Sequence, residues 1–197
     1  MARAKDIDKP SQIIEAAFEV FGRTGYEATL VKEIADRAGI SAGTVYTYFH
    51  DKRELFDATA REGWSRFLDQ IRDLVESEGP AEDRLLQLLQ IGFDSLRRHL
   101  PLLRGMLFES SQANILQENI DQLCMLVERL LMGRTAGGLN PAVDATSRRS
   151  SIRFTVIGVL FSAALAQPDR VEQEMAGLRK TVMGMLSVGA PGRANGA

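Results

Sequence analysis

Residues 41–52 place hydroxyl groups, small side chains and a lysine at the spacing of a short helix and the start of the next one. Hydroxyls of this kind can donate hydrogen bonds to phosphate oxygens, and a threonine can also meet a base edge. Small side chains at a helix start let the backbone approach a base pair closely. These residue types predict contacts with double-stranded DNA by Ser41, Ala42, Gly43, Thr44, Tyr46, Thr47 and Lys52.

Lys52 is placed in the first turn of a predicted helix, where the helix dipole disfavours a positive charge. The free backbone N–H groups at that helix start favour an anion. A bound phosphate would explain a lysine at this position. We therefore expect most of these contacts to position the protein on DNA, and only a few to read the bases.

The elements that must hold these residues have the spacing of a helix-turn-helix over residues 31–50. Ala35 is small enough for two helices to cross closely, and Gly39 can adopt the positive φ that the turn needs. Residues at the right offsets predict a small shared core of Ile34, Ala38, Ile40, Val45 and Tyr48. A helical hairpin that only packs is the alternative interpretation.

The rest of the chain also has helical periodicity, and no segment shows the sustained alternation typical of a strand. The sequence thus predicts an all-α protein. Thr29 is predicted to cap the second helix, and Asp51 with Glu54 to form a capping box at the fourth. Helices are expected over about 11–24, 30–37, 42–48, 51–76, 81–99, 113–133, 143–166 and 169–187, with a further short one from Pro101.

Residues 12–56 carry the patterns GYxAT and IAxxAGxSxGTxYxYFxxKxxL. With these patterns, this stretch resembles the DNA-binding region of the TetR/AcrR family of bacterial transcriptional regulators. Carried over by position, the resemblance implies that Thr29, Tyr46 and Lys52 contact phosphates. It implies equally that Ala42, Gly43 and Thr44 face bases. Thr47 stands where family members often have histidine. The arm residues Arg3 and Lys5 either reach the DNA or remain solvated.

The resemblance implies an N-terminal three-helix helix-turn-helix domain over residues 1–55. A C-terminal helical ligand-binding and dimerisation domain over residues 56–190 and a disordered tail over 191–197 follow. The function implied is a repressor that binds a palindromic operator as a homodimer and is released by a small apolar or amphipathic effector. An activator, or a helical ligand-binding or scaffold protein without specific DNA function, is the alternative.

Apolar residues in the last predicted helix are spaced four and three apart, which is typical of a seam between helices. The predicted dimer interface comprises Phe161, Val171, Met175, Leu178, Val182 and Met185. Internal core is the alternative for this set.

A ligand pocket is implied by the family, and large apolar residues are the candidates to line it. They are Trp64, Phe67, Phe93, Met106, Phe108, Cys124 and Phe154, with plain core as the alternative for each. A ligand beside Trp64 and Phe67 is expected to tilt the helix over 51–76 and so change the spacing of the recognition helices.

Composition narrows the classes of function. The net charge is −2, and residues 1–60 hold 8 basic and 10 acidic side chains, so a generic polyanion binder is excluded. One cysteine cannot form an internal disulfide, which fits the cytoplasm. The longest apolar run, residues 154–166, is shorter than the roughly 20 residues of a membrane span. With two histidines and no hydrolase, P-loop or metal motif, we expect no enzyme activity, no cofactor and no metal.

Overall fold

The computed structural model describes residues 9–108, 113–132 and 144–165, together with residues 170, 173–174, 176–178 and 180. Every regular element in this part of the chain is helical, which confirms the predicted all-α class. The helices are α2 (Lys9–Ala28), α3 (Val31–Arg37), α4 (Ala42–Tyr48), α5 (Lys52–Glu76), α6 (Ala81–Phe108), α7 (Ala113–Met132) and α8 (Ala145–Leu165).

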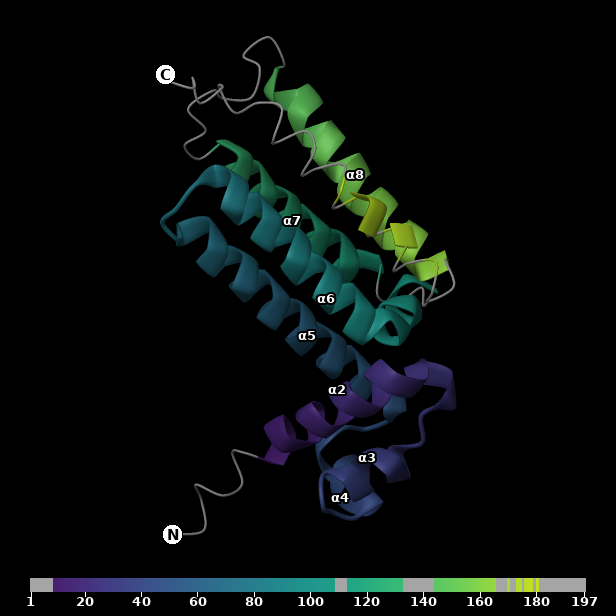
Figure 1. The fold of residues 1–197 in the computed structure, drawn as a ribbon. Helices are drawn as coiled ribbons and strands as arrows, with labels where there is room; N and C mark the ends of the chain where they lie inside the picture. Colours follow the sequence, from purple (N-terminus) through teal and green to yellow (C-terminus); the bar gives the residue numbers. More distant parts are fainter. Residues whose placement is uncertain are drawn as a thin grey trace, which may run out of the picture.

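The helices form two connected parts (Figure 1). Helices α2, α3 and α4 gather at one end of the molecule, and the longer helices α5 to α8 lie side by side at the other. Helix α5 joins the two parts. Its 25 residues span about 37 Å, long enough to run from the small end deep into the bundle.

The first helices end where backbone chemistry requires it. Gly25 has a φ of 77°, in the left-handed region that favours glycine, and it breaks the regular helix within α2. The prediction that Thr29 caps the next helix was wrong. Leu30 occupies the cap position of α3, and its N–H donates to the Glu33 carboxylate at 3.4 Å.

Side-chain caps fix the starts of α4 and α5. The Ser41 hydroxyl accepts the N–H of Thr44 at 3.1 Å, and the Asp51 carboxylate accepts the N–H of Glu54 at 2.7 Å. The Glu54 carboxylate in turn accepts the N–H of His50 at 2.6 Å, one residue before the position that a capping box would use. These bonds determine where the short helix α4 begins and how the chain leaves it.

Helix α6 combines two segments that the sequence predicted as separate. The element is continuous over Ala81–Phe108, but His99 departs from helical geometry with φ −122° and ψ 18°. Pro101 explains the break, because its ring lacks an N–H and clashes with the carbonyl four residues earlier. The residue before a proline also disfavours the helical region. The predicted boundary therefore appears as a kink.

Aromatic rings connect the small end to the bundle. Phe21 and Tyr26 of α2 both contact Phe56 of α5, with ring centroids 5.1 Å and 4.9 Å apart and edge-on geometry. Phe21 and Phe56 are fully buried. Edge-on pairs are worth about 0.5–1.5 kcal/mol beyond the area they bury. The first turns of α5 thus share one core with α2.

Two glycines allow the helices around this core to approach closely. A Cβ at Gly63 of α5 would lie 2.6 Å from Phe18 Cε2, and a Cβ at Gly105 of α6 would lie 2.8 Å from Phe56 Cζ. Neither distance is compatible with a methyl group unless the ring moves. The contact of α2, α5 and α6 therefore depends on hydrogen atoms at these positions.

Arginines tie helix ends to neighbouring elements. The Arg104 side chain of α6 donates to the carbonyl of Ala164 at 2.8 Å, at the end of α8. Arg84 donates to the carbonyl of Val75 at 3.3 Å, near the end of α5. The last carbonyls of a helix lack partners inside the helix, so a cation is favourable there. These bonds fix α8 on α6 and close the turn between α5 and α6.

Gly105→Ala is expected to destabilise the protein although alanine is the better helix former. Overpacking against the buried Phe56 ring costs about 1–3 kcal/mol, which exceeds the gain of about 1 kcal/mol in helix propensity. Gly92→Ala on the same helix is the matched control, because a Cβ there meets no atom within 4 Å. Urea unfolding should show a loss for the first variant and a gain for the second. Equal gains would contradict the close approach.

Candidate functional site

Helices α3 and α4 form the predicted helix-turn-helix. Ala35 is fully buried at the crossing, and Gly39 has a φ of 69° in the turn. Ile34 and Val45 fill the shared core, while Ala38, Ile40 and Tyr48 are half-buried around it. The spacing that predicted this motif therefore corresponds to the observed packing.

One face of α4 is left open to solvent. Ser41, Gly43 and Thr47 are exposed, Ala42 and Thr44 are half-buried, and Tyr46 is 51% exposed. The Tyr46 hydroxyl has no hydrogen-bond partner within the described residues. A tyrosine that is neither packed nor hydrogen-bonded contributes little to folding, so this face is available for a partner.

Several hydroxyls on this face already have internal partners. The Thr44 and Ser41 hydroxyls lie 2.9 Å apart, and the Thr47 hydroxyl donates to the carbonyl of Gly43 at 3.1 Å. Each oxygen keeps free acceptor capacity, and each hydroxyl can rotate. The face can thus exchange weak local bonds for contacts with a ligand.

Thr29, expected at the surface, is instead fully buried. Its hydroxyl donates to the carbonyl of Gly25 at 2.6 Å and lies 2.7 Å from the Thr24 hydroxyl. A side chain enclosed in this way holds the turn between α2 and α3 and has no surface for a phosphate. The corrected role of Thr29 is to position the helix-turn-helix.

Lys52 is half-buried at the start of α5. Its ammonium donates to the carbonyl of Glu27 at 3.1 Å and lies 4.6 Å from the centroid of the Tyr26 ring. The carbonyl and the ring hold the charge against the end of α2. An anion is not needed to place this lysine, in contrast to the expectation from the helix dipole.

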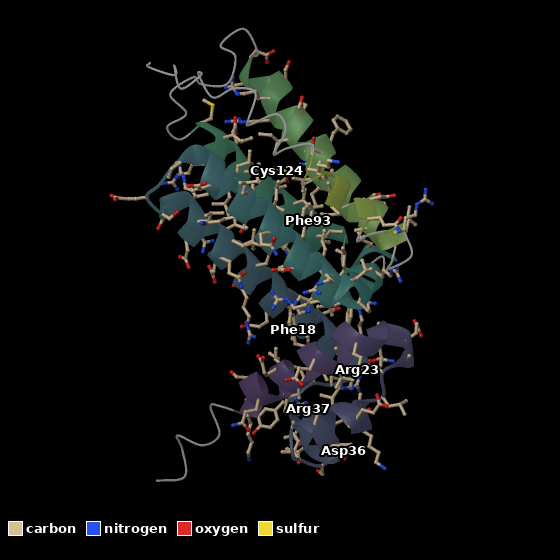
Figure 2. All side chains as sticks on the ribbon, in the orientation of Figure 1. Phe18, Arg23, Asp36, Arg37, Phe93 and Cys124 are labelled. Atoms are coloured by element: carbon tan, nitrogen blue, oxygen red, sulfur yellow. The ribbon has the colours of Figure 1, made fainter. Side chains whose placement is uncertain are left out.

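Acidic residues of the N-terminal part form ion pairs away from α4. Glu15 pairs with Arg66 of α5 at 2.6 Å, and Glu19 pairs with Arg37 of α3. The hydrogen bonds that the Arg66 guanidinium donates to Glu62 and Glu15 raise the pKa of Arg66. Figure 2 shows Arg37, Arg23 and Asp36 together at the small end of the molecule. These pairs neutralise Glu15 and Glu19, two of the ten acidic side chains of residues 1–60. The predicted arm residues Arg3 and Lys5 lie outside the described residues.

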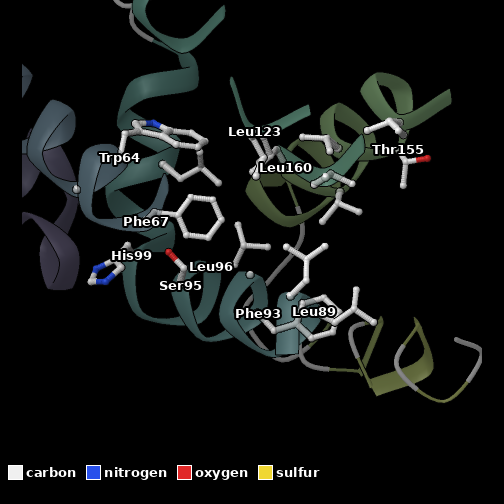
Figure 3. A pocket seen from close by; sticks show the side chains of 18 of the residues that line it. Trp64, Phe67, Leu89, Phe93, Ser95, Leu96, His99, Leu123, Thr155 and Leu160 are labelled. Atoms are coloured by element: carbon white, nitrogen blue, oxygen red, sulfur yellow. The ribbon is translucent and has the colours of Figure 1, made fainter. Parts of the chain in front are cut away.

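A cavity of about 440 Å³ lies inside the bundle (Figure 3). All the helices of the bundle contribute to its wall, and so does Phe18 of α2. Its volume falls within the range of small-molecule sites, about 300–1,000 Å³. The wall is almost wholly apolar and includes Trp64, Phe67, Leu88, Leu89, Phe93, Leu96, Leu102, Met106, Leu123, Val127, Val156 and Leu160.

Four of the residues predicted for a pocket, Trp64, Phe67, Phe93 and Met106, line this cavity. Cys124 does not; it is half-buried beside the core on α7, and burial raises the pKa of its thiol. Phe154 is 77% exposed and lies outside the cavity wall, which corrects its assignment. The side chain of Phe108 lies outside the described residues.

Sequence reasoning missed Phe18 and His99 as cavity residues. The His99 ring packs against the Phe18 ring at a tilted angle, with centroids 4.3 Å apart. No signal in the sequence distinguishes a residue that packs against atoms from one that borders an empty space.

Helix α8 has two unlike faces. Leu160, Ala163 and Ala164 are buried. Phe154, Phe161 and Leu165 are exposed by 77%, 44% and 70%, and they follow one another at intervals of seven and four residues. Leu178, another predicted interface residue, is also exposed. The predicted residues Val171, Met175, Val182 and Met185 lie outside the described residues.

Membrane-spanning helices and metal-binding clusters are both absent from the part of the chain that the structure describes. No helix there is long and apolar enough to cross a membrane. No group of three or more His, Cys, Asp or Glu side chains is arranged to hold a metal ion among the same residues.

Comparisons with known proteins agree with this architecture. Residues 13–59 match the family model of bacterial regulatory proteins of the TetR family. The fatty acid metabolism regulator protein of Bacillus subtilis is 27% identical over 154 residues, covering 75% of this chain and 79% of that one. The transcriptional repressor KstR2 of Mycobacterium tuberculosis is 33% identical over 88 residues, 45% of this chain and 44% of that one.

Solved structures extend the likeness beyond the first helices. The fatty acid degradation regulator FadR from Bacillus halodurans is 27% identical, with a TM-score of 0.66 over 90% of this chain and 94% of that one. FadR from Bacillus subtilis in complex with stearoyl-CoA has the same TM-score of 0.66 at 21% identity, over 92% of this chain and 99% of that one.

The fold and the open face of α4 define a helix-turn-helix transcriptional regulator, not an enzyme. Residues 13–59 are the DNA-binding domain shared by regulators of the TetR family.

Replacing Thr29 and Thr47 in turn by valine should distinguish a residue that supports the fold from one that is free to contact a partner. Both hydroxyls donate to a carbonyl four residues earlier, but Thr29 is buried and Thr47 is exposed. Thr29→Val should lower the unfolding free energy by about 1–3 kcal/mol, because it leaves buried polar atoms unpaired. Thr47→Val should change stability by less than about 0.5 kcal/mol. Thermal and urea unfolding measure both, and similar values for the two variants would refute a positioning role for Thr29.

Proposed function

We propose that this protein is a repressor that binds a palindromic DNA operator as a homodimer and is released by a small apolar or amphipathic effector. The observation that carries the proposal is the exposed face of α4, where Tyr46 is displayed without an internal partner. In the proposed arrangement, residues 1–55 bind DNA and residues 56–190 bind the effector and the second protomer.

We infer that the start of α4 enters the major groove. Ser41, Gly43 and Thr44 lie at this end, where small side chains allow a close approach and hydroxyls can meet base edges. Tyr46 and Thr47 are exposed on α4, and in this proposal they supply donors for phosphates together with Lys52 at the start of α5. Thr29 supports this surface from inside and makes no contact of its own.

Exposed apolar residues on α8 support the homodimer. Phe154, Gly158, Phe161 and Leu165 follow one another at intervals of four, three and four residues. This spacing is the seam that a second helix packs against. Two protomers related by a two-fold axis would each cover the other's exposed rings, and their two α4 helices would then meet a palindromic site.

The apolar cavity supports a hydrophobic effector. Relatives of this chain are a fatty acid metabolism regulator and a fatty acid degradation regulator, and a protein of the same fold is solved in complex with stearoyl-CoA. We propose a ligand with a long apolar portion, such as a fatty acyl compound. An effector that binds the DNA-incompetent state more tightly shifts the population away from the operator.

The cavity borders α5, which joins the two ends of the molecule, and α2, which packs against the bundle. Trp64 and Phe67 belong to α5, the helix that follows α4 in the chain, and Phe18 belongs to α2. A ligand that displaces these rings would tilt both helices together. The distance between the two α4 helices of a dimer would change as a result.

An activator would use the same surfaces, and a scaffold protein would use the cavity without the DNA face. The displayed Tyr46 favours a DNA-binding protein over a scaffold.

Selection of random duplexes by the purified protein is expected to recover a palindrome. Tyr46→Phe should weaken binding to the selected duplex roughly tenfold or more, since a bond to a charged group is worth about 1.5–3 kcal/mol. Tyr48→Phe is the matched control, because Tyr48 is half-buried beside the core. Fluorescence anisotropy at several salt concentrations gives both affinities. Enrichment of no sequence at low salt would favour the scaffold alternative.

Phe161→Asp should convert the dimer into monomers, because a charge would be buried in the apolar seam. Sedimentation velocity at micromolar concentration measures the state directly. Leu30→Asp serves as the control, since Leu30 is a comparably exposed apolar residue at the DNA-binding end. A dimer that survives Phe161→Asp would place the interface elsewhere.

A further inference from the structure

Polar groups are few in the cavity wall, and they lie on two different helices. Besides the indole of Trp64, they are Ser95 and His99 on α6 and Ser151 and Thr155 on α8. Figure 3 shows Ser95 and His99 on the side of Phe67, while Thr155 lies at the opposite side of the cavity. The described wall contains no Asp, Glu, Lys or Arg.

The two polar pairs differ in whether their hydrogen bonds are satisfied. The Ser151 hydroxyl donates to the carbonyl of Ser147, and the Thr155 hydroxyl donates to the carbonyl of Ser151, both at 2.9 Å. Both residues are exposed. The Ser151 and Thr155 hydroxyls therefore do not need a ligand to satisfy their hydrogen bonds.

Ser95 and His99 have no hydrogen-bond partner within the described residues. They stand four residues apart on α6, so their side chains project from one face of the helix. The Nδ1 atom of His99 is buried without a partner. A Cβ at Gly22 of α2 would lie 3.5 Å from this atom, so Nδ1 is directed toward α2, and we infer that Nε2 is the ring atom for a ligand.

Few polar groups lie in this apolar wall, so a ligand atom that pairs with the Ser95 hydroxyl and the His99 ring gains hydrogen bonds that the rest of the wall cannot supply. We propose that Ser95 and His99 form a subsite for one uncharged oxygen, a hydroxyl or a carbonyl, on an otherwise apolar ligand. The proposal rests on the proposed function of the cavity as the effector site and names the chemistry that the effector must carry.

The absence of charged side chains from the described wall favours an uncharged ligand oxygen over a carboxylate. Burial lowers the pKa of His99, and the positive charge of Arg98 adds to this effect, so the imidazole is neutral at pH 7. A neutral imidazole and a hydroxyl can pair with a carbonyl or an alcohol. A carboxylate in the same place would be buried without a counter-charge, which is far more costly.

The subsite also touches the DNA-binding end of the molecule. The His99 ring packs against Phe18 of α2 at a tilted angle, and it sits at the kink that Pro101 imposes on α6. An oxygen bound to Ser95 and His99 therefore acts next to the contact between α2 and the bundle. An alkyl chain elsewhere in the cavity would not.

Trp64 is the only tryptophan of the chain and borders the cavity, so its fluorescence reports occupancy. The probes are decane, 1-decanol, methyl decanoate and decanoate, titrated into the full-length protein. The alcohol and the ester should bind about three- to tenfold more tightly than the alkane, the gain expected for one neutral hydrogen bond. Decanoate should gain no such advantage.

Ser95→Ala and His99→Phe should each reduce this preference, while binding of decane stays close to that of the wild type. Phenylalanine keeps a ring against Phe18, so the fold does not depend on the imidazole. Ser65→Ala is the matched control, because Ser65 is exposed on α5 beside Trp64 and outside the cavity wall. Thr155→Val tests the other side of the cavity.

Equal binding of all four probes, no binding of any probe, tighter binding of decanoate, or loss of preference only in Thr155→Val would each overturn the subsite. Operator binding by the wild-type protein is measured separately. Its absence would contradict the proposed function, while the probe series still decides whether Ser95 and His99 recognise an oxygen.

Discussion

The close approach of α2 to α5 and α6 is the constraint on which the rest of the structure depends. Gly63 and Gly105 supply the space, and the rings of Phe18 and Phe56 fill it. Because α2 packs on the bundle, the helix-turn-helix is not an independent module on a flexible linker. Its orientation follows from rings and backbone in van der Waals contact, which makes the small end responsive to changes of a few tenths of an ångström in the bundle.

The exposed face of α4 depends on this same packing. A helix of seven residues is too short to be stable alone, so α4 exists only through its caps and its buried side chains. Val45 anchors it in the core, and Ser41 fixes its first turn. Tyr46, which faces outward, is thereby freed from a role in folding and can be chosen for what it contacts.

Much of this architecture could be predicted from sequence because it is local. Caps, glycine turns and apolar spacing placed α3, α4 and α5 within a residue or two of their observed bounds, and Gly39 adopted the turn that was expected. The failures involve long-range information. Thr29 has the right type for a surface contact but is enclosed by α2, and Phe154 has the right type for a pocket but lies on the outer face of α8. The role of His99 depends on a kink and on a ring from another helix, which spacing along the chain cannot reveal.

Helix α8 forms one wall of the cavity, with Leu160 on the inner side and Phe161, the next residue, on the outer side. A wall one helix thick cannot move on one side alone. Where the outer rings pair with a second protomer, occupancy of the cavity and association of protomers become linked equilibria. The response to a ligand then depends on the concentration of the protein in the cell. Dissociation of the dimer changes the contacts on the outer side of α8, and ligand binding changes those on its inner side.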